Sequence, residues 1–331
     1  MSDAESITPL TCGQEIAEDT TLDGDLTCRS GPALVVTADS VTLDLGGHTV
    51  FGDRNGANNG PAIVLRSVSG VTVCNGTVQY FGAGIVIEGG SGNTVENVTV
   101  QDNVGSAEGD YGDGIVVDGS SENVIADNTV QRNGPFSGIS LLNESQRNEI
   151  RGNVVADNSM SNTGDPRAGR QDMGIRMEGP GASENLVQGN TVTGSGADGI
   201  VVLPTCQDPE SDPPCVGAPA NEGNRIVGNT SDGNGRSGTG SGIRLFSMPA
   251  PVPPTGNTIE DNVTNDNATD GISVDARATG NTIRNNRANG NGRFDGNDGN
   301  ADAADANTWE GNVFGTANVP TVNAAASIGK M

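Results

Sequence analysis

The sequence predicts an all-β chain, folded as a single-stranded right-handed parallel β-helix of about nine to ten coils with an asparagine ladder. Residues 84–103 and 114–133 share one pattern: G-I-x-V, a polar turn, then two further short apolar segments that end in Asn. Apolar and polar residues alternate within each segment, which predicts three short strands per copy. Repeats of roughly 24 residues with three strands each are typical of a parallel β-helix. Further copies begin at Gly138, Gly174, Gly199, Gly242 and Gly271.

The composition fits a narrow solenoid. The 331 residues are 33% hydrophobic but only 3% aromatic. Stacked coils bury a continuous column that Ile, Val and Leu can fill without large side chains. Asn also recurs at one tight turn, where its amide can bond the equivalent amide one coil away. We expect this ladder to contain Asn75, Asn97, Asn128, Asn153, Asn190, Asn229 and Asn262.

The charge excludes several classes of partner. The formal net charge is −25, and Lys330 is the only lysine. Nucleic acids and anionic membranes bind basic surfaces, so neither is an expected partner. No stretch approaches the roughly 18 apolar residues of a membrane span, and membrane insertion is not expected. The sequence does not predict an oligomeric state.

The five cysteines divide into Cys12 with Cys28, Cys206 with Cys215, and Cys74 alone. Two pairs that close short loops favour disulfides, and disulfides favour an oxidising compartment. We therefore expect a secreted or extracytoplasmic protein, although residues 1–10 do not read as a signal peptide.

The chain divides into a capping segment (1–30), the β-helix (31–316) and a C-terminal tail (317–331). Trp309 takes the inward position of a degraded last coil, where it would plug the apolar column. The single histidine, His48, follows a Gly-Gly turn and is interpreted as structural. Residues 295–302, DGNDGNAD, alternate Asp and Asn as calcium loops do. They lack the glycine at the fixed turn position of an EF-hand loop and its distal Glu. A solvated turn is the preferred interpretation there, and calcium is the one cofactor left open.

The motif LDLGGHTV at residues 43–50, followed by N-x-V-x-x-N repeats, carries a family resemblance. It resembles parallel β-helix repeat proteins of the pectate-lyase-like superfamily, which includes polysaccharide lyases, mannuronan epimerases and some glycosidases. The resemblance covers residues 31–316. It implies that G-I-x-V is the first strand of each coil and that the active site lies along the sheet of first strands. The long insertions in the repeat also border this sheet, and long loops on a rigid scaffold often carry function.

Candidate site residues follow from strand alternation, because the residue between two inward apolar residues faces outward. Charged residues at these positions concentrate in the middle coils and in the adjoining insertions. The catalytic candidates are Tyr111, Asp113, Asp118, Arg170, Asp172, Arg176, Glu178 and Asp198. The substrate-binding candidates are Arg66, Glu88 and Arg244. Asp113, Asp198 and Asp270 share a D-G-I pattern, which is also compatible with a simple role in turn formation.

Two reactions on a poly- or oligosaccharide fit these residues, and the sequence places lyase or epimerase chemistry ahead of hydrolysis. Lyase or epimerase chemistry on a uronate needs a group that neutralises the substrate carboxylate, such as Arg176 or Arg244, and a proton-exchanging group such as Tyr111 or Arg170. Glycoside hydrolysis needs two carboxylates, for which Asp113 with Asp118 and Glu178 with Asp198 or Asp172 are available. A non-catalytic glycan-binding surface is the third alternative. The net charge of −25 opposes polyuronate substrates at long range.

Overall fold

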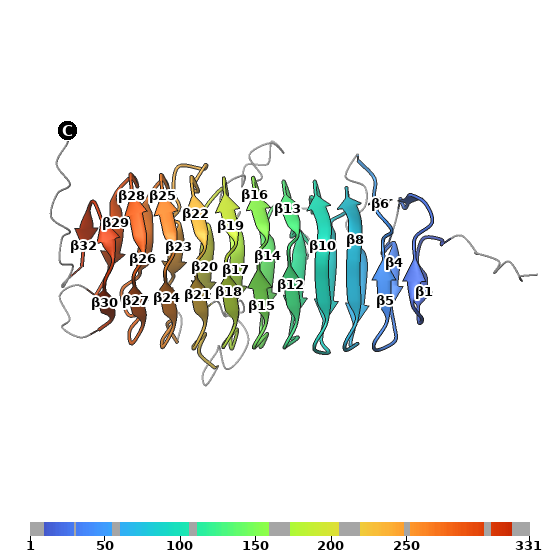
Figure 1. Ribbon diagram of the computed structural model, residues 1–331, viewed down its shortest axis with the longest axis horizontal. Helices are drawn as coiled ribbons and strands as arrows, with labels where there is room; N and C mark the ends of the chain where they lie inside the picture. Colours follow the sequence, from blue (N-terminus) through green and yellow to red (C-terminus); the bar gives the residue numbers. More distant parts are fainter. Residues whose placement is uncertain are drawn as a thin grey trace, which may run out of the picture.

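The computed structural model describes residues 10–29, 31–54, 60–105, 111–158, 173–204, 219–247, 252–300 and 306–319. These residues form an elongated parallel β-helix, with β1 (Gln14–Ile16) near one end and β32 (Ala317–Asn318) near the other (Figure 1). This confirms the predicted fold class. The described residues contain no helix that could cross a membrane.

The first strands of successive coils form one twelve-stranded parallel sheet, which we call sheet A. Its inward Ile residues stack in register, since Ile115 pairs with both Ile85 and Ile139, and Ile139 pairs with Ile175. All four are fully buried, so the predicted apolar column exists. Between β1 and β32, sheet A comprises β4 (Leu34–Val36), β7 (Pro61–Arg66), β9 (Ala83–Glu88), β11 (Ile115–Asp118), β14 (Ser137–Leu142), β17 (Met173–Glu178), β20 (Ile200–Leu203), β23 (Ile243–Leu245), β26 (Asp270–Val274) and β29 (Phe294–Asp298).

The second and third strands of each coil form two further parallel faces. β8 (Thr72–Gln79) and β10 (Thr94–Gln101) run without a break through both faces. The other second strands are β2 (Thr20–Thr21), β5 (Thr42–Asp44), β12 (Val124–Ala126), β15 (Glu149–Arg151), β18 (Leu186–Gln188), β21 (Arg225–Val227), β24 (Thr258–Glu260), β27 (Thr282–Arg284) and β30 (Thr308–Glu310). The other third strands are β3 (Leu26–Thr27), β6 (Thr49–Phe51), β13 (Thr129–Gln131), β16 (Val154–Ala156), β19 (Thr191–Thr193), β22 (Thr230–Asp232), β25 (Val263–Asn265), β28 (Arg287–Asn289) and β31 (Val313–Phe314).

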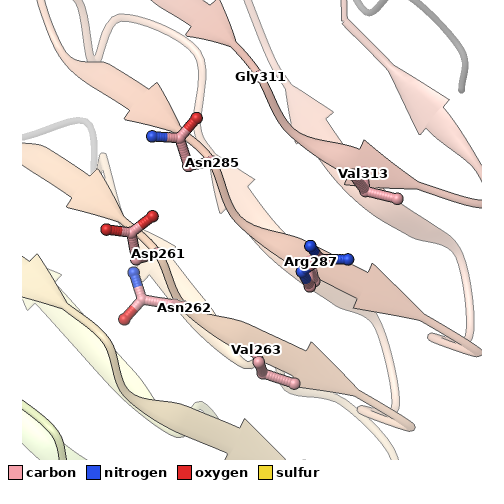
Figure 2. A pocket seen from close by; sticks show the side chains of 7 residues that line it. All are labelled: Asp261, Asn262, Val263, Asn285, Arg287, Gly311 and Val313. Atoms are coloured by element: carbon pink, nitrogen blue, oxygen red, sulfur yellow. The ribbon is translucent and has the colours of Figure 1, made fainter.

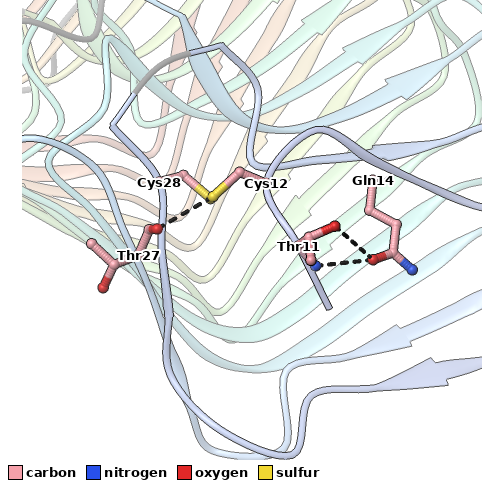
Figure 3. The surroundings of a disulfide bond; sticks show 5 residues. All are labelled: Thr11, Cys12, Gln14, Thr27 and Cys28. Carbon is pink, nitrogen blue, oxygen red and sulfur yellow. Dashed lines mark hydrogen bonds between the residues drawn. A yellow bond between two sulfur atoms is a disulfide. The ribbon is translucent and has the colours of Figure 1, made fainter. Parts of the chain in front are cut away.

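The described part of the N-terminal segment, expected as a cap, is itself a coil. β1, β2 and β3 pair in parallel with β4, β5 and β6. This coil lies over the open end of the column and brings the total above the nine to ten expected. The Cys12–Cys28 disulfide closes it, with a Cα–Cα distance of 5.5 Å (Figure 3). Cys74 is a buried free thiol, and the predicted Cys206–Cys215 pair lies outside the described residues.

Three asparagine ladders, rather than one, run along the turns. At the second turn, Asn128 Nδ2 donates to Asn153 Oδ1 at 3.0 Å, and the same bond repeats through Asn190, Asn229 and Asn262. Two more ladders, which the sequence analysis missed, run through Asn93, Asn123 and Asn148 at the first turn and through Asn103, Asn133 and Asn158 at the third.

The prediction that Asn75 and Asn97 belong to the second-turn ladder was wrong. Asn128 Oδ1 instead accepts from the backbone N–H of Val98, at 2.9 Å. Asn75 and Asn97 are exposed residues with positive φ values, 59° and 55°. The reason is that β8 and β10 continue straight through this corner, so Gly76 and Val98 take the ladder position.

The far end of the column is closed as predicted. Trp309 is paired in register with Ile283, is 4% exposed, and packs edge-to-face on Phe314 at 6.1 Å. Its indole Nε1–H donates to Asp298 at 2.8 Å. The interpretation of residues 295–302 as a solvated turn was wrong for the part that the structure describes, because Asp295 and Asp298 lie in β29 and are buried. His48 lies in the turn after β5, where its backbone N–H donates to Leu45 O.

Candidate functional site

The G-I motif explains how carboxylates reach the outer face of sheet A. A Cβ on Gly114 would lie 2.5 Å from Val130 Cγ1 and 2.8 Å from Asn133 Nδ2, so this position faces the filled interior. Only glycine fits there, next to the inward Ile115. The preceding Asp113 lies at the outer face, where its Oδ1 accepts from the hydroxyl of the outward Ser140. The D-G-I aspartates are therefore outward residues of the sheet as well as corner residues.

Strand pairing brings the predicted outward positions into straight rows. Arg176 pairs in register with Ser140 on one side and Val201 on the other, and Arg244 follows Val201. Glu178 lies in the next outward row, in register with Leu142 and Leu203. The rows place Arg176 and Arg244 two coils apart, about 9.6 Å along the axis.

The first cluster on this face joins Asp113, Ser140, Arg176 and Glu178. Ser140 Oγ donates to Asp113 Oδ1 at 2.5 Å, and Arg176 Nη2 lies 3.3 Å from the same oxygen. Arg176 Nη1 forms an ion pair with Glu178 Oε2. The Arg176 guanidinium also lies over the Phe136 ring, 5.7 Å from its centroid.

This cluster is almost sealed from solvent. The side chains of Arg176, Asp113 and Glu178 are 8%, 4% and 7% exposed. Burial raises the pKa of Asp113, because desolvation penalises its charged form more than Arg176 and Ser140 stabilise it. One arginine therefore faces two carboxyl groups, and burial makes Asp113 easier to protonate than an ordinary aspartate.

A second cluster lies further along the same face. Arg244 binds Asp275 through two parallel hydrogen bonds, Nε to Oδ1 at 3.0 Å and Nη2 to Oδ2 at 2.9 Å. Its Nη1 lies 3.7 Å from Asp198 Oδ2, and its guanidinium lies 4.3 Å from the Phe246 ring centroid. Burial is also the main cause of a raised pKa at Asp198. The two carboxylates of the predicted pair, Glu178 and Asp198, therefore lie in different clusters.

The remaining candidates lie outside these two clusters. Asp118 belongs to the same outward row as Glu178, two coils away, with Leu142 between them. Arg66 and Glu88 form an ion pair at 3.2 Å near the N-terminal end of the face. Asp118 accepts from Asn143 Nδ2 at 2.5 Å. Tyr111 packs against a small apolar patch of Ala83, Val86 and Val116 on the outer face. Arg170 and Asp172 lie outside the described residues.

A third cluster was missed by the sequence analysis. Arg293 binds the fully buried Asp270, with Nε to Oδ1 at 2.9 Å, and lies 5.6 Å from the Phe294 ring centroid. Asp270 carries the same D-G-I signal as Asp113 and Asp198. Each buried D-G-I aspartate thus meets an arginine from a later coil, and this repetition could have been found by aligning the coils.

The described surface also has a depression away from sheet A. A shallow depression of about 370 Å³ lies between the second and third strands of the C-terminal coils and is lined by Asp261, Asn262, Val263, Asn285, Arg287, Gly311 and Val313 (Figure 2). It is remote from the three arginine clusters. In the part of the chain that the structure describes, no three His, Cys, Asp or Glu side chains are grouped to hold a metal ion.

Comparison with known proteins agrees with this architecture. A family model described as a right-handed beta helix region matches residues 35–179. The family model and the solved structures agree on a right-handed parallel β-helix, the fold that the sequence motifs indicated. No curated protein sequence matches the chain significantly.

Several solved structures share the fold. The A-module of an Azotobacter vinelandii mannuronan C-5 epimerase superposes with a TM-score of 0.61 at 13% identity, covering 94% of this chain and 78% of that one. A pectate lyase gives 0.57 at 15% identity, with coverages of 90% and 74%. An endo-xylogalacturonan hydrolase from Aspergillus tubingensis gives 0.51 at 12% identity, with coverages of 97% and 91%. At these identities the likeness establishes the fold alone.

Proposed function

We propose that the protein is a carbohydrate-active β-helix that cleaves a glycosidic bond on the outer face of sheet A, with Asp113 as the general acid and Glu178 as the partner carboxylate. The observation that carries this proposal is the buried Asp113, whose pKa is raised, joined to Glu178 through Arg176. Glycoside hydrolysis requires one carboxyl group that keeps its proton and a second that is charged.

The residues around the pair support these roles. Ser140 and Arg176 fix the orientation of Asp113, and Arg176 holds Glu178 as an ion pair. A general acid must hold its proton near the working pH, which desolvation of Asp113 favours. Similar structures include a hydrolase, a lyase and an epimerase of polysaccharides, which supports a glycan as the substrate class.

The arginines favour a neutral glycan over a uronate. Arg176 and Arg244 were the groups expected to bind a substrate carboxylate, but carboxylates of the chain already occupy both guanidinium groups. A substrate carboxylate would have to displace Glu178 or Asp275 and would then face a free negative charge at close range. The net charge of −25 also repels an anionic substrate at long range.

Lyase or epimerase chemistry on a uronate is the second candidate. The observation that favours it is that Arg176 and Arg244 share one outward row of sheet A, where successive sugar rings of one chain would pass both. In that mechanism each arginine exchanges its internal partner for a substrate carboxylate.

The test is a screen of neutral glycans, alginate and pectate, with reducing ends and unsaturated products measured separately. New reducing ends without unsaturated product would support hydrolysis, and unsaturated product would support the lyase alternative. Asp113→Asn and Glu178→Gln should each lower kcat by about 10²-fold to 10⁴-fold. Glu260→Gln removes one carboxylate of an ion pair with Arg284 on another face and should leave the rate unchanged.

Either of two results would refute the assignment: an Asp113→Asn variant that keeps full activity, or a chain inactive on the whole panel that still binds glycans. The second result would instead identify a non-catalytic glycan-binding protein. We also propose an extracytoplasmic location, because the Cys12–Cys28 disulfide requires an oxidising environment to persist.

A further inference from the structure

The third strands form an outer face that differs from sheet A. In six consecutive coils, the first and third residues of each third-strand segment point outward, while the Val between them is fully buried. These residues are in register from coil to coil. We call the twelve outward positions the Thr/Gln strip; they are the ends of the segments Thr49–Phe51, Thr77–Gln79, Thr99–Gln101, Thr129–Gln131, Val154–Ala156 and Thr191–Thr193.

The Thr/Gln strip carries no charge. None of its twelve described positions is Asp, Glu, Lys, Arg or His, in a chain whose net charge is −25. The second-strand face of the same coils has Asp44, Glu96 and Arg151 at outward positions. Charges that border the strip are neutralised by pairing, since Asp102 binds Arg132 at 2.8 Å and Asp157 binds Arg236 at 2.6 Å. The strip is thus an electrically neutral band on an acidic protein.

The polar groups of the strip are fixed in place. Gln131 Nε2 donates to Gln101 Oε1 at 3.0 Å, and Gln101 Nε2 donates to Gln79 Oε1 at 2.8 Å. Gln101 Oε1 also accepts from Arg132 Nη2 at 3.0 Å, so both of its lone pairs are used. An amide has two N–H donors, and the ladder uses one N–H of Gln101 and one of Gln131, which leaves the second N–H of each for a ligand. Binding to pre-ordered side chains loses little conformational entropy.

The dimensions of the strip favour a narrow occupant. Six coils span about 24 Å along the axis, and three residues of strand span about 10 Å across it. The resulting area of roughly 240 Å² is far below the roughly 800 Å² per partner that a stable protein interface buries. A second copy of this acidic chain would therefore find too little neutral surface, whereas one extended polymer chain fits the strip.

We propose that the Thr/Gln strip binds a neutral polysaccharide chain that lies along the helix axis. Threonine hydroxyls and glutamine amides are suitable hydrogen-bond partners for sugar hydroxyls. The strip has a threonine in five of its six coils and a glutamine in three consecutive ones, at Gln79, Gln101 and Gln131. The strip lacks the cations that a nucleic acid or an anionic polysaccharide requires. This binding site is separate from the proposed cleavage site on sheet A, and it does not depend on that proposal.

The strands β8 and β10 provide a matched test. Thr77→Asp with Thr99→Asp places two charges on the strip, and Thr72→Asp with Thr94→Asp places the same two charges on the second-strand face of the same strands. All four threonines are partly exposed and in register. Binding is measured by co-sedimentation with cellulose and chitin and by affinity electrophoresis in gels that contain laminarin, with alginate as the anionic comparison.

The wild-type chain should bind at least one neutral probe more strongly than alginate, and the strip variant should bind it at least tenfold more weakly. The second-strand variant should bind as the wild type does. Equal losses in both variants, or no binding of the wild type to any neutral probe, would overturn the proposal. Gln101→Ala, which adds no charge, should also weaken binding, and equal melting temperatures would show that folding is intact.

Discussion

Asn190 provides the most direct test of the idea that the ladders hold the coils together. Its side chain makes four buried hydrogen bonds. It donates to Asn229 Oδ1 at 2.9 Å and to Ile150 O at 2.8 Å, and it accepts from the backbone N–H and the Nδ2 of Asn153 at 2.9 and 3.0 Å. The residue is 1% exposed, so water does not replace these partners in the folded chain.

The change Asn190→Ala removes all four bonds. Asn153 keeps other acceptors for its side-chain amide, Ile125 O and Arg151 O, but its backbone N–H loses this partner, and Ile150 O loses a donor. The unsatisfied buried N–H of Asn153 should cost about 1–3 kcal/mol, and the lost donor to Ile150 O should cost part of that amount. We therefore expect the free energy of unfolding to fall by about 2–4 kcal/mol.

Urea unfolding followed by far-UV circular dichroism measures this change. The control is Asn97→Gly, which removes an exposed amide at φ 55°, where glycine is unstrained. It should change stability by less than about 0.5 kcal/mol. If the two variants lost the same stability, or if Asn190→Ala lost less than about 1 kcal/mol, the ladder would not be a stabilising element.

Three further predictions concern a buried carboxyl group, the aromatic plug and the disulfide. The raised native pKa of Asp113 means that its contribution to stability is complete below its unfolded pKa and is lost as pH rises through the native value, by up to about 1.4 kcal/mol per pH unit. Asp113→Asn should therefore reduce the fall of the melting temperature as pH rises above about 4, the ordinary pKa of an unfolded aspartate, and parallel profiles of the wild type and the variant would contradict this. Trp309→Ala should cost about 3–5 kcal/mol in urea unfolding, because it opens the end of the column; a cost under 1 kcal/mol would disprove the plug. Replacing Cys12 and Cys28 by Ser opens a loop of 16 residues and should cost about 3 kcal/mol, while unchanged stability would argue against the bond.

The fold was predictable because the repeat is visible in residue types alone. Gly114 and Ile115 mark the start of a first strand, and the alternation after them fixes which side chains face the column. The inward row Ile115, Ile139 and Ile175 follows directly from that pattern. The first coil was harder to see, because β1 to β3 are only two or three residues long and Ile16 and Leu22 are its main apolar signal.

The details of the ladder and of the site depend on spacing that the sequence does not display. Asn97 lies four residues after Asn93, but Asn128 lies five after Asn123, so at the same corner Asn128 takes the ladder position while Asn97 lies one residue before it. The outward positions of Arg176 and of its strand neighbour Glu178 were predictable, while the contact with Asp113 was not, because the two residues are 63 positions apart in the sequence. Glu178 and Asp198 were predicted as a possible carboxylate pair, but Glu178 pairs with Arg176 and Asp198 lies beside Arg244.

The pairing register of sheet A is preserved across segments of very different length. Residues 143–172 separate β14 from β17 and residues 179–199 separate β17 from β20, yet Ile139, Ile175 and Ile200 remain in one row. Connections on this side can thus lengthen or shorten in evolution without disturbing the interior. Such a scaffold lets new specificities arise by exchange of loops, while the inherited coil remains intact.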